Sequence, residues 1–307
     1  MKVVNLCAGV IVTMGLVACD QPPDTGEDRG PGDPGSATWE AADETLPSPL
    51  IEGNIELGYR MVTTDSPRPV VLLMGGFGTS YKAYNEALDH LTSHGYHTVG
   101  VDLPRIGALY AAAHDRSAME ITAVIDHIVS GASPLGSRVR SDQIAMAGHS
   151  LGGKIAFYAA SLDPRIRLVL AMDPSNSGGP PCFIDSDGCH AFPVADNPET
   201  GQKGVMDSMQ AASVIFRAPP DLLTNPDKFA NAINFWHSLP TTGYLFDFPE
   251  ARHASWVGNA GIQQITNRTM VAMLQQTFDG KDSSLWFSAA TVAKDAADGV
   301  SYTISTK

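Results

Sequence analysis

The chain has 307 residues and a formal net charge of −13 at pH 7. An acidic surface repels the phosphates of nucleic acids and anionic lipid head groups, so we expect neither as a partner. The length is ample for one large domain with a sizeable hydrophobic core.

The N-terminus predicts export. Lys2 precedes an apolar run, residues 3–17, that is short for a membrane span and typical of a signal peptide. The run ends in Leu-Val-Ala-Cys at Cys19, which resembles a bacterial lipobox. That resemblance implies removal of residues 1–18 and a lipid on Cys19 that anchors the protein to a bacterial membrane, on the periplasmic or the cell-surface side. The alternative is an ordinary secretory signal.

Residues 19–48 are rich in Asp, Glu, Pro, Gly and Ser and poor in apolar side chains. Such a segment cannot bury enough surface to offset its ordering entropy, so we expect a flexible acidic tether. We expect residues 49–307 to form one domain and the protein to be a monomer.

Short apolar runs alternate with amphipathic stretches from residue 70 onward, which predicts an α/β fold with a mostly parallel sheet flanked by helices. The predicted strands cover residues 70–74, 97–101, 143–147, 168–172, 213–216 and 244–248. The predicted helices cover residues 81–93, 117–130, 154–161, 226–237 and 261–278. Residues 281–307 leave open a helix followed by a strand at 300–305.

The most informative motif is Gly-His-Ser-Leu-Gly at residues 148–152, between a predicted strand and a predicted helix. A strand–Gly-x-Ser-x-Gly–helix pattern is a nucleophile elbow, in which small residues allow a strained turn to expose a serine hydroxyl. We therefore predict Ser150 as a nucleophile. The alternative is an ordinary polar turn.

A serine hydroxyl needs a base, and the base needs an acid that holds its tautomer. In chains with such an elbow the histidine of the triad comes last in the sequence. His253 follows the last predicted core strand and therefore fits this order. Asp221 and Asp173 each follow a predicted strand and are both candidates for the acid. Asp221 is preferred, because its strand is expected to adjoin that of the histidine.

An oxyanion hole needs two backbone N–H groups aimed at the developing negative charge. Leu151 follows the nucleophile directly and supplies one. The loop Gly-Gly-Phe-Gly-Thr at residues 75–79 supplies the other, for which we predict Phe77. The same loop lacks the full Gly-x-Gly-x-x-Gly spacing of a dinucleotide site.

Residues 174–212 form a long insertion rich in Gly and Pro, for which we predict a rim or cap over the substrate site. Cys182 and Cys189 lie within it and are expected to form a disulfide in an oxidising compartment. A metal site is not expected, because two cysteines and His190 are an incomplete ligand set at the wrong spacing.

Residues 67–278 resemble the α/β-hydrolase superfamily, specifically its bacterial cutinase-like polyesterase and chlorophyllase-like branches. The resemblance rests on Pro-Val-Val-Leu-Leu from residue 69, the glycine loop and Leu-Thr-Ser-His-Gly-Tyr from residue 91. Similarity to the cutinase-like branch in residues 235–253 implies Asp221 as the acid, whereas the Asp-Pro-Ser starting at Asp173 is similar to the chlorophyllase pattern. The polyesterases carry Ala-Pro-Trp at that place, so polymer hydrolysis is in doubt.

The sequence thus predicts an exported, lipid-anchored serine esterase that needs no metal or organic cofactor and acts on a lipid, a small ester or a polyester. Two alternatives remain open. One is an acyltransferase that uses the same triad. The other is a non-catalytic surface binding protein on a hydrolase scaffold.

Overall fold

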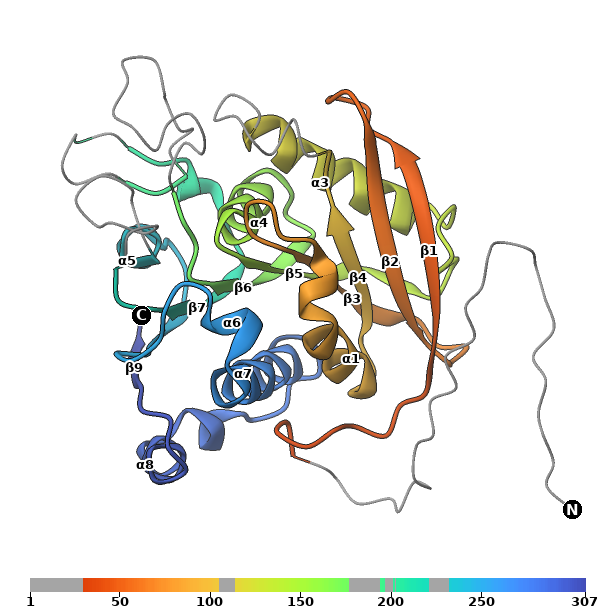
Figure 1. Cartoon of the computed structure of the whole chain (residues 1–307). Coiled ribbons are helices and arrows are strands. Elements are labelled where there is room, and N and C mark those ends of the chain that lie inside the picture. The colour runs from red at the N-terminus through yellow and green to blue at the C-terminus, as the bar shows by residue number, and fades with distance from the viewer. Residues whose placement is uncertain (1–29, 105–113, 177–193, 197–200, 202, 221–231) are drawn as a thin grey trace, which may run out of the picture.

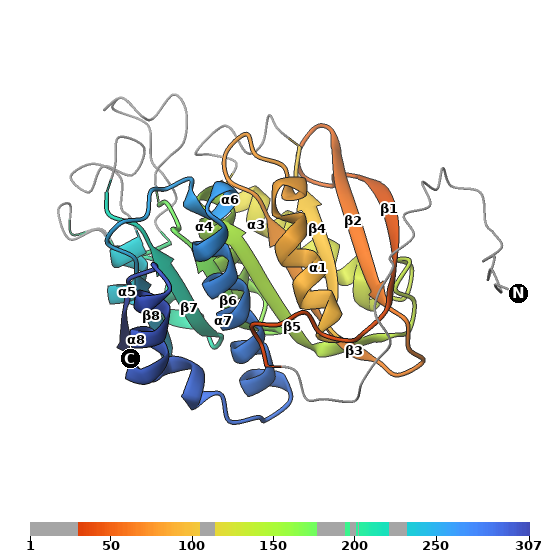
Figure 2. The ribbon, with the colours of Figure 1, turned by 60° about the horizontal axis from the view of Figure 1, so that its bottom comes forward.

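The computed structural model describes residues 30–104, 114–176, 194–196, 201, 203–220 and 232–307. Their core is a twisted sheet with helices on both faces (Figures 1 and 2). The described strands are β1 (Trp39–Pro47), β2 (Asn54–Val62), β3 (Arg68–Met74), β4 (His97–Asp102), β5 (Val139–His149), β6 (Ile166–Met172), β7 (Ala212–Arg217), β8 (Gly243–Asp247) and β9 (Thr303–Thr306).

Within the described residues the sheet has nine strands in the order β1-β2-β4-β3-β5-β6-β7-β8-β9. In this spatial order the six neighbouring strands β4, β3, β5, β6, β7 and β8 pair in parallel. β1, β2 and β9 pair antiparallel at the two edges. This is the mostly parallel, helix-flanked sheet expected from the sequence, and it is consistent with the α/β-hydrolase fold.

Helices cover the two faces because successive side chains of a strand point to opposite sides. Val70 and Leu72 belong to the cluster under α3, α4 and α5, whereas Val71 and Leu73 belong to the cluster under α1 and α7. Strands buried on both faces therefore read as continuous apolar runs. The described helices are η1 (Tyr81–Tyr84), α1 (Asn85–Ser93), α3 (His114–Val129), α4 (Leu151–Leu162), η3 (Met206–Ser208), α5 (Ala232–Ser238), α6 (Ser255–Gly258), α7 (Ala260–Phe278), η4 (Ser284–Phe287) and α8 (Ala289–Ala297).

The strand register brings the ends of three parallel strands side by side. His149 at the end of β5 pairs with Met172 of β6, and Met172 pairs with Phe216 of β7. Phe216 in turn pairs with Phe246 of β8. The residues that follow these positions therefore emerge along one edge of the sheet.

The tether is shorter than the sequence predicted. Residues 39–47, expected within the tether, form the edge strand β1 along the whole of β2. Its half-buried positions carry Trp39, Ala42, Glu44 and Leu46, so neither face of this edge strand is consistently apolar and the sequence shows no strand periodicity. Earlier residues are also fastened to the domain, since the N–H of Gly35 donates to Ser93 Oγ at 2.9 Å. The folded part thus reaches back at least to residue 30.

Two further elements, β2 and the short α6, were not predicted. The predicted helix 81–93 begins with the 3₁₀ turn η1. The open expectation for residues 281–307 corresponds to α8 and β9. Of the predicted helix 226–237, the first six positions lie outside the described residues.

Candidate active site

Ser150 occupies the turn between β5 and α4 with φ of +54° and ψ of −116°. A non-glycine residue in this region costs on the order of 1–3 kcal/mol and persists only where its surroundings enforce it. Here the N–H of Ser150 donates to the carbonyl of Met172 at 2.9 Å, and its own carbonyl accepts from the N–H of Lys154 at 3.1 Å. The turn therefore holds the hydroxyl at the edge where β5 and β6 end.

The glycines of the elbow are required by close backbone approach. A Cβ at Gly148 would lie 2.3 Å from the carbonyl carbon of Gly152. A Cβ at Gly152 would lie 2.6 Å from the carbonyl oxygens of both Gly75 and Met74. The elbow and the glycine loop after β3 are thus packed against each other, backbone to backbone.

His253 lies in the loop between β8 and α6, and its imidazole reaches the serine. Nε2 of His253 is 2.8 Å from Oγ of Ser150. Both side chains belong to buried residues. The serine hydroxyl can therefore donate its proton to this nitrogen, provided that the imidazole carries its hydrogen on Nδ1.

Asp173 holds that tautomer. Its Oδ2 lies 2.6 Å from Nδ1 of His253, and its Oδ1 accepts from the N–H of Ala218 at 3.2 Å. Asp173 directly follows β6 and also has a positive φ, +42°. With 2% of its surface exposed, it is shielded from water. Ser150, His253 and Asp173 therefore form a continuous hydrogen-bonded triad.

The geometry does not support the preference for Asp221. The strand of Asp221, β7, does adjoin the histidine's strand, β8, as expected. The loop that carries His253 nevertheless reaches past β7 to the end of β6, where Asp173 accepts the single hydrogen on Nδ1. Asp221 itself lies outside the described residues.

The two residues expected as oxyanion donors belong to segments that adjoin Ser150. Leu151 is the first residue of α4, where backbone N–H groups have no partner within the helix. Phe77 belongs to the glycine loop and is 39% exposed. A Cβ on the neighbouring Gly76 would lie 3.1 Å from Cβ of Ser150, so this loop borders the nucleophile directly.

Sequence reasoning missed two buried residues beside the triad, Tyr84 and His149. Nδ1 of His149 is 2.7 Å from the hydroxyl of Tyr84, and Nε2 of His149 is 2.7 Å from the carbonyl oxygen of His253. Burial, together with the nearby His253, lowers the pKa of His149 to about 3. A histidine directly before the nucleophile was the available signal, but its partners lie far away in the sequence.

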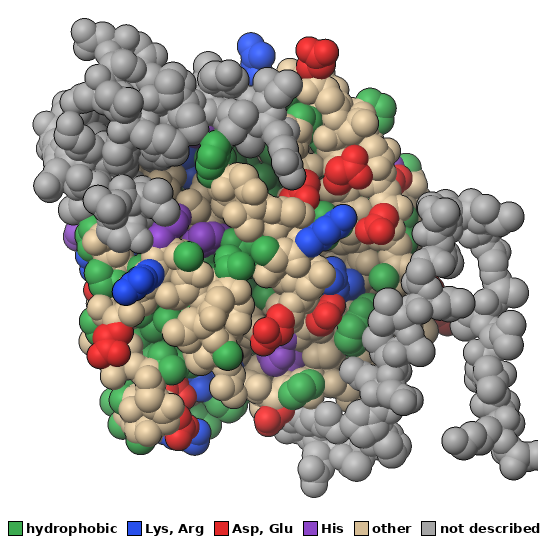
Figure 3. Space-filling model, viewed as in Figure 1, with side chains coloured by type: hydrophobic (Ala, Val, Ile, Leu, Met, Phe, Trp, Pro, Cys, Tyr) green, Lys and Arg blue, Asp and Glu red, His purple; other side chains and the backbone are tan. Residues whose placement is uncertain are grey.

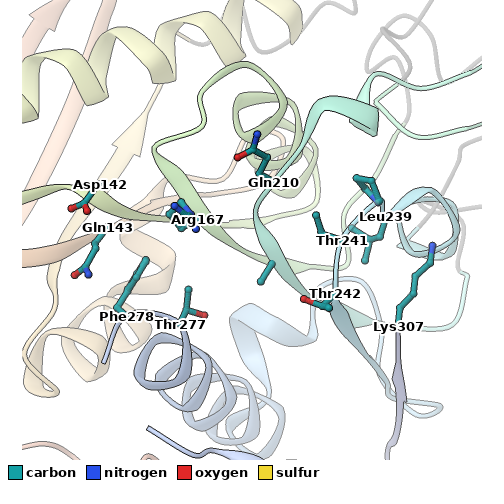
Figure 4. Close-up of a pocket in the computed structure, with 12 residues that line it drawn as sticks. Asp142, Gln143, Arg167, Gln210, Leu239, Thr241, Thr242, Thr277, Phe278 and Lys307 are labelled. Atoms are coloured by element: carbon teal, nitrogen blue, oxygen red, sulfur yellow. The ribbon is translucent and has the colours of Figure 1, made fainter. Parts of the chain in front are cut away.

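A cavity of about 730 Å³ lies at the opposite edge of the sheet, away from Ser150, His253 and Asp173 (Figure 4). Arg167 near the start of β6 and Ala212 at the start of β7 line it, together with Thr242 just before β8. The triad stands at the other ends of these same strands.

Acidic side chains gather on the surface over β1 and β2 (Figure 3), in agreement with the negative net charge.

Several predicted features lie outside the described residues. They are Cys19 with the signal peptide, the pair Cys182 and Cys189, and most of the insertion 174–212. Within the described ranges, no group of three or more His, Cys, Asp or Glu side chains could hold a metal ion. No helix in that same part of the chain is long and apolar enough to cross a bilayer.

Comparison with known proteins connects part of this chain to the chlorophyllases. Residues 60–175 match the chlorophyllase family. Chlorophyllase-1 of Arabidopsis thaliana is 29% identical over 113 residues, which are 34% of this chain and 35% of that protein. Chlorophyllase-1, chloroplastic, of Citrus unshiu is 31% identical over 106 residues, 34% of this chain and 32% of that protein.

The match therefore spans about a third of the length of these relatives. The family match includes Ser150 and Asp173 and ends before His253. It confirms the predicted likeness to the chlorophyllase-like branch over residues 60–175. The likeness to the cutinase-like polyesterases stays a prediction.

Proposed function

We propose that this protein is a serine hydrolase that cleaves carboxylic esters through an acyl-enzyme intermediate. The observation that carries the proposal is the hydrogen-bonded line from Asp173 through His253 to Ser150. The match of residues 60–175 to the chlorophyllases, a family of carboxylic ester hydrolases, supports the same reaction class. A protein that only binds a ligand has no need of such an arrangement.

In the first half of the reaction, Oγ of Ser150 attacks the ester carbonyl carbon while Nε2 of His253 takes the hydroxyl proton. The carboxylate of Asp173 stabilises the imidazolium that forms. When the tetrahedral intermediate collapses, the carbon–oxygen bond to the alcohol breaks, and the imidazolium gives its proton to the departing oxygen. Ser150 is then left as an acyl ester.

In the second half, a water molecule attacks the acyl carbon while His253 takes one of its protons. Collapse releases the carboxylic acid and returns the proton to Oγ of Ser150. In both halves the backbone N–H groups of Phe77 and Leu151 stabilise the oxyanion. Loss of one such donor typically costs on the order of 10²–10³ in kcat.

The direct test is turnover of p-nitrophenyl esters of increasing chain length by the purified protein and by Ser150→Ala. The variant should lose several orders of magnitude in kcat, because no other described group takes the place of the nucleophile. Ser213→Ala is the matched control, since Ser213 is a fully buried serine on β7 outside the triad. Equal rates from wild type and Ser150→Ala would contradict the proposal and favour a binding protein.

We also propose that the protein is exported and anchored through a lipid on Cys19. The support is the signal-like sequence of residues 1–18 and the lipobox-like end of that segment. The main chain at Pro31 and Gly35 contacts His90 and Ser93 of the domain, and the residues between Cys19 and residue 30 lie outside the described part of the chain. The full-length protein should partition into the detergent phase of Triton X-114, and Cys19→Ala should move it to the aqueous phase. Aqueous partitioning of both proteins would contradict the anchor.

A further inference from the structure

His149 contacts three parts of the active site at once. It ends β5 directly before Ser150, and only 6% of its surface is exposed. One ring nitrogen meets Tyr84 at the end of η1, and the other meets the main chain of His253. A Cβ on Gly76 of the glycine loop would lie 3.2 Å from Nδ1 of His149. The imidazole thus fills the space between η1, the glycine loop and the loop that carries His253.

We propose that Tyr84 and His149 form a directional hydrogen-bond chain that positions the main chain of His253 and the glycine loop relative to Ser150. The inference rests on the proposed ester hydrolysis, for which these would be positioning residues. Neither side chain needs to touch the substrate. Their part is to keep the base and the oxyanion loop in register with the nucleophile.

The direction of the chain follows from what each atom can do. The carbonyl oxygen of His253 can only accept, so Nε2 of His149 must carry the hydrogen that it donates at 2.7 Å. Nδ1 then carries the lone pair and accepts from the hydroxyl of Tyr84. Gly76 lies beside this bond, since a Cβ there would be 3.2 Å from Nδ1 of His149. The hydrogen-bond chain therefore runs from Tyr84 through His149 to the carbonyl of His253, and the glycine loop packs against it.

This direction requires a neutral imidazole. A protonated His149 would donate from both nitrogens, and Nδ1 could no longer accept from Tyr84. Burial and the neighbouring His253 lower the pKa of His149 to about 3, and burial raises the pKa of Tyr84. Both groups therefore keep the same protonation state throughout the pH range in which an esterase would work.

The hydrogen-bond chain restrains the main chain at His253, which the triad contacts do not restrain. Asp173 and Ser150 orient the imidazole of His253, but neither fixes the backbone that carries it. The bond from His149 holds that backbone at its carbonyl, and the two imidazole rings lie 4.6 Å apart at an angle of 37°. Catalytic groups must be held to well under 1 Å, so loss of this support should reduce kcat.

The activity test compares His149→Gln with His149→Met. The amide nitrogen of Gln can reproduce the donor at Nε2, whereas Met fills a similar volume without a donor. We expect His149→Met to lose about 10- to 100-fold in kcat with KM changed by less than about twofold, and His149→Gln to recover much of that loss. Stability should follow the opposite order, because a buried amide is costlier than a thioether. Equal activity of the two variants would overturn the proposal.

Two matched variants separate positioning from general damage to the fold. Tyr84→Phe removes only the hydroxyl and should lower kcat, whereas Tyr81→Phe, another buried tyrosine of η1, should not. His97 is a buried histidine whose Nδ1 accepts from the N–H of Val62 at 3.0 Å and whose Nε2 meets the carbonyl of Arg138 at 3.1 Å. His97→Gln should therefore lower stability while kcat per folded molecule stays unchanged. A kcat loss in His97→Gln equal to that in His149→Met would contradict the proposal.

A spectroscopic readout keeps the inference separable from the proposed function. In ¹⁵N-histidine-labelled protein, the signal that disappears in His149→Gln should report a neutral ring with its hydrogen on Nε2 down to about pH 4. The same spectrum in Tyr84→Phe should show Nδ1 with a changed shift, because its donor is lost. A neutral ring with the hydrogen on Nδ1, or protonation of His149 near pH 6, would overturn the chain even if esterase activity is found. Absence of esterase activity with the expected spectrum would instead reject the proposed function alone.

Discussion

Nε2 of His253 lies 2.8 Å from Oγ of Ser150, although 103 positions separate the two residues in the chain. The sheet explains this proximity. β5 and β8 both run in the same direction, with β6 and β7 between them, and the register places their ends along one edge. The turn after β5 presents the hydroxyl, and the loop after β8 crosses back over β7 and β6 to present the imidazole.

The identity of the triad acid is tested by two single substitutions. Asp173→Asn should lower kcat on the order of 10³- to 10⁴-fold, because an amide next to Nδ1 favours the wrong imidazole tautomer. Asp221→Asn should remain near wild type. Steady-state kinetics on a p-nitrophenyl ester decide between them, and a large loss in Asp221→Asn with an active Asp173→Asn would reverse the assignment.

The contact between the elbow and the glycine loop predicts that a side chain at Gly152 destabilises the protein. Gly152→Ala should lower the free energy of unfolding by about 1–3 kcal/mol, since its methyl would lie 2.6 Å from two carbonyl oxygens. That cost should exceed the gain of up to about 1 kcal/mol that alanine brings to a helix.

Gly258→Ala is the matched control, because a methyl at this helical position meets nothing within 4 Å. It should leave stability unchanged or raise it slightly. Urea denaturation followed by circular dichroism measures both variants. A Gly152→Ala protein as stable as Gly258→Ala would show that the close approach is not rigid.

Lys154 predicts an unusual dependence of stability on pH. Complete burial lowers its pKa from 10.5 to about 7. Between these two values the unfolded chain holds a proton that the folded protein has released. The free energy of unfolding should therefore rise with pH in this window, by up to about 1.4 kcal/mol per pH unit from this group.

Lys154→Met removes the titrating group and should flatten this part of the profile. The free energy of unfolding of Lys154→Met should exceed that of wild type most at pH 7 and below. This difference should disappear toward pH 10. Urea denaturation at several pH values measures the difference. Lys281→Met at an exposed position serves as the control. Parallel profiles for wild type and Lys154→Met would contradict a strongly lowered pKa.

A buried ion pair fastens the C-terminal elements to α7. Arg268 Nη1 donates to Asp295 Oδ1 at 2.9 Å, and the hydroxyl of Tyr302 donates to Oδ2 of the same carboxylate at 2.6 Å. Asp295→Ala should lower the free energy of unfolding by about 3–5 kcal/mol, because it leaves a buried guanidinium without its counter-charge.

The double variant Arg268→Met with Asp295→Leu should recover most of that loss, since it removes both charges and fills the space with apolar side chains. Thermal denaturation of the single and double variants provides the measurement. The idea would fail if the double variant were no more stable than Asp295→Ala. Esterase activity per folded molecule should be unchanged in both, because these residues lie away from the triad.

Local patterns in the sequence were sufficient for the features that depend on neighbouring residues. Apolar runs such as residues 70–74 marked strands buried on both faces, and the glycines around Ser150 marked a strained turn. The edge strand β1 was not predicted because its residues are mostly polar, follow no regular polar–apolar alternation and are nowhere fully buried. Chain order together with the position after the last predicted core strand was enough to select His253 among nine histidines.

The sequence by itself determined the elbow at Ser150, the alternation of strands and helices, and the charge of the surface, because each is set by adjacent residues or by composition. Only the tertiary structure decided that Asp173 meets His253 and that His149 joins Tyr84 to the main chain of His253. Those contacts join residues 65 to 104 positions apart. Their distances depend on strand order and register, which no short stretch of sequence encodes.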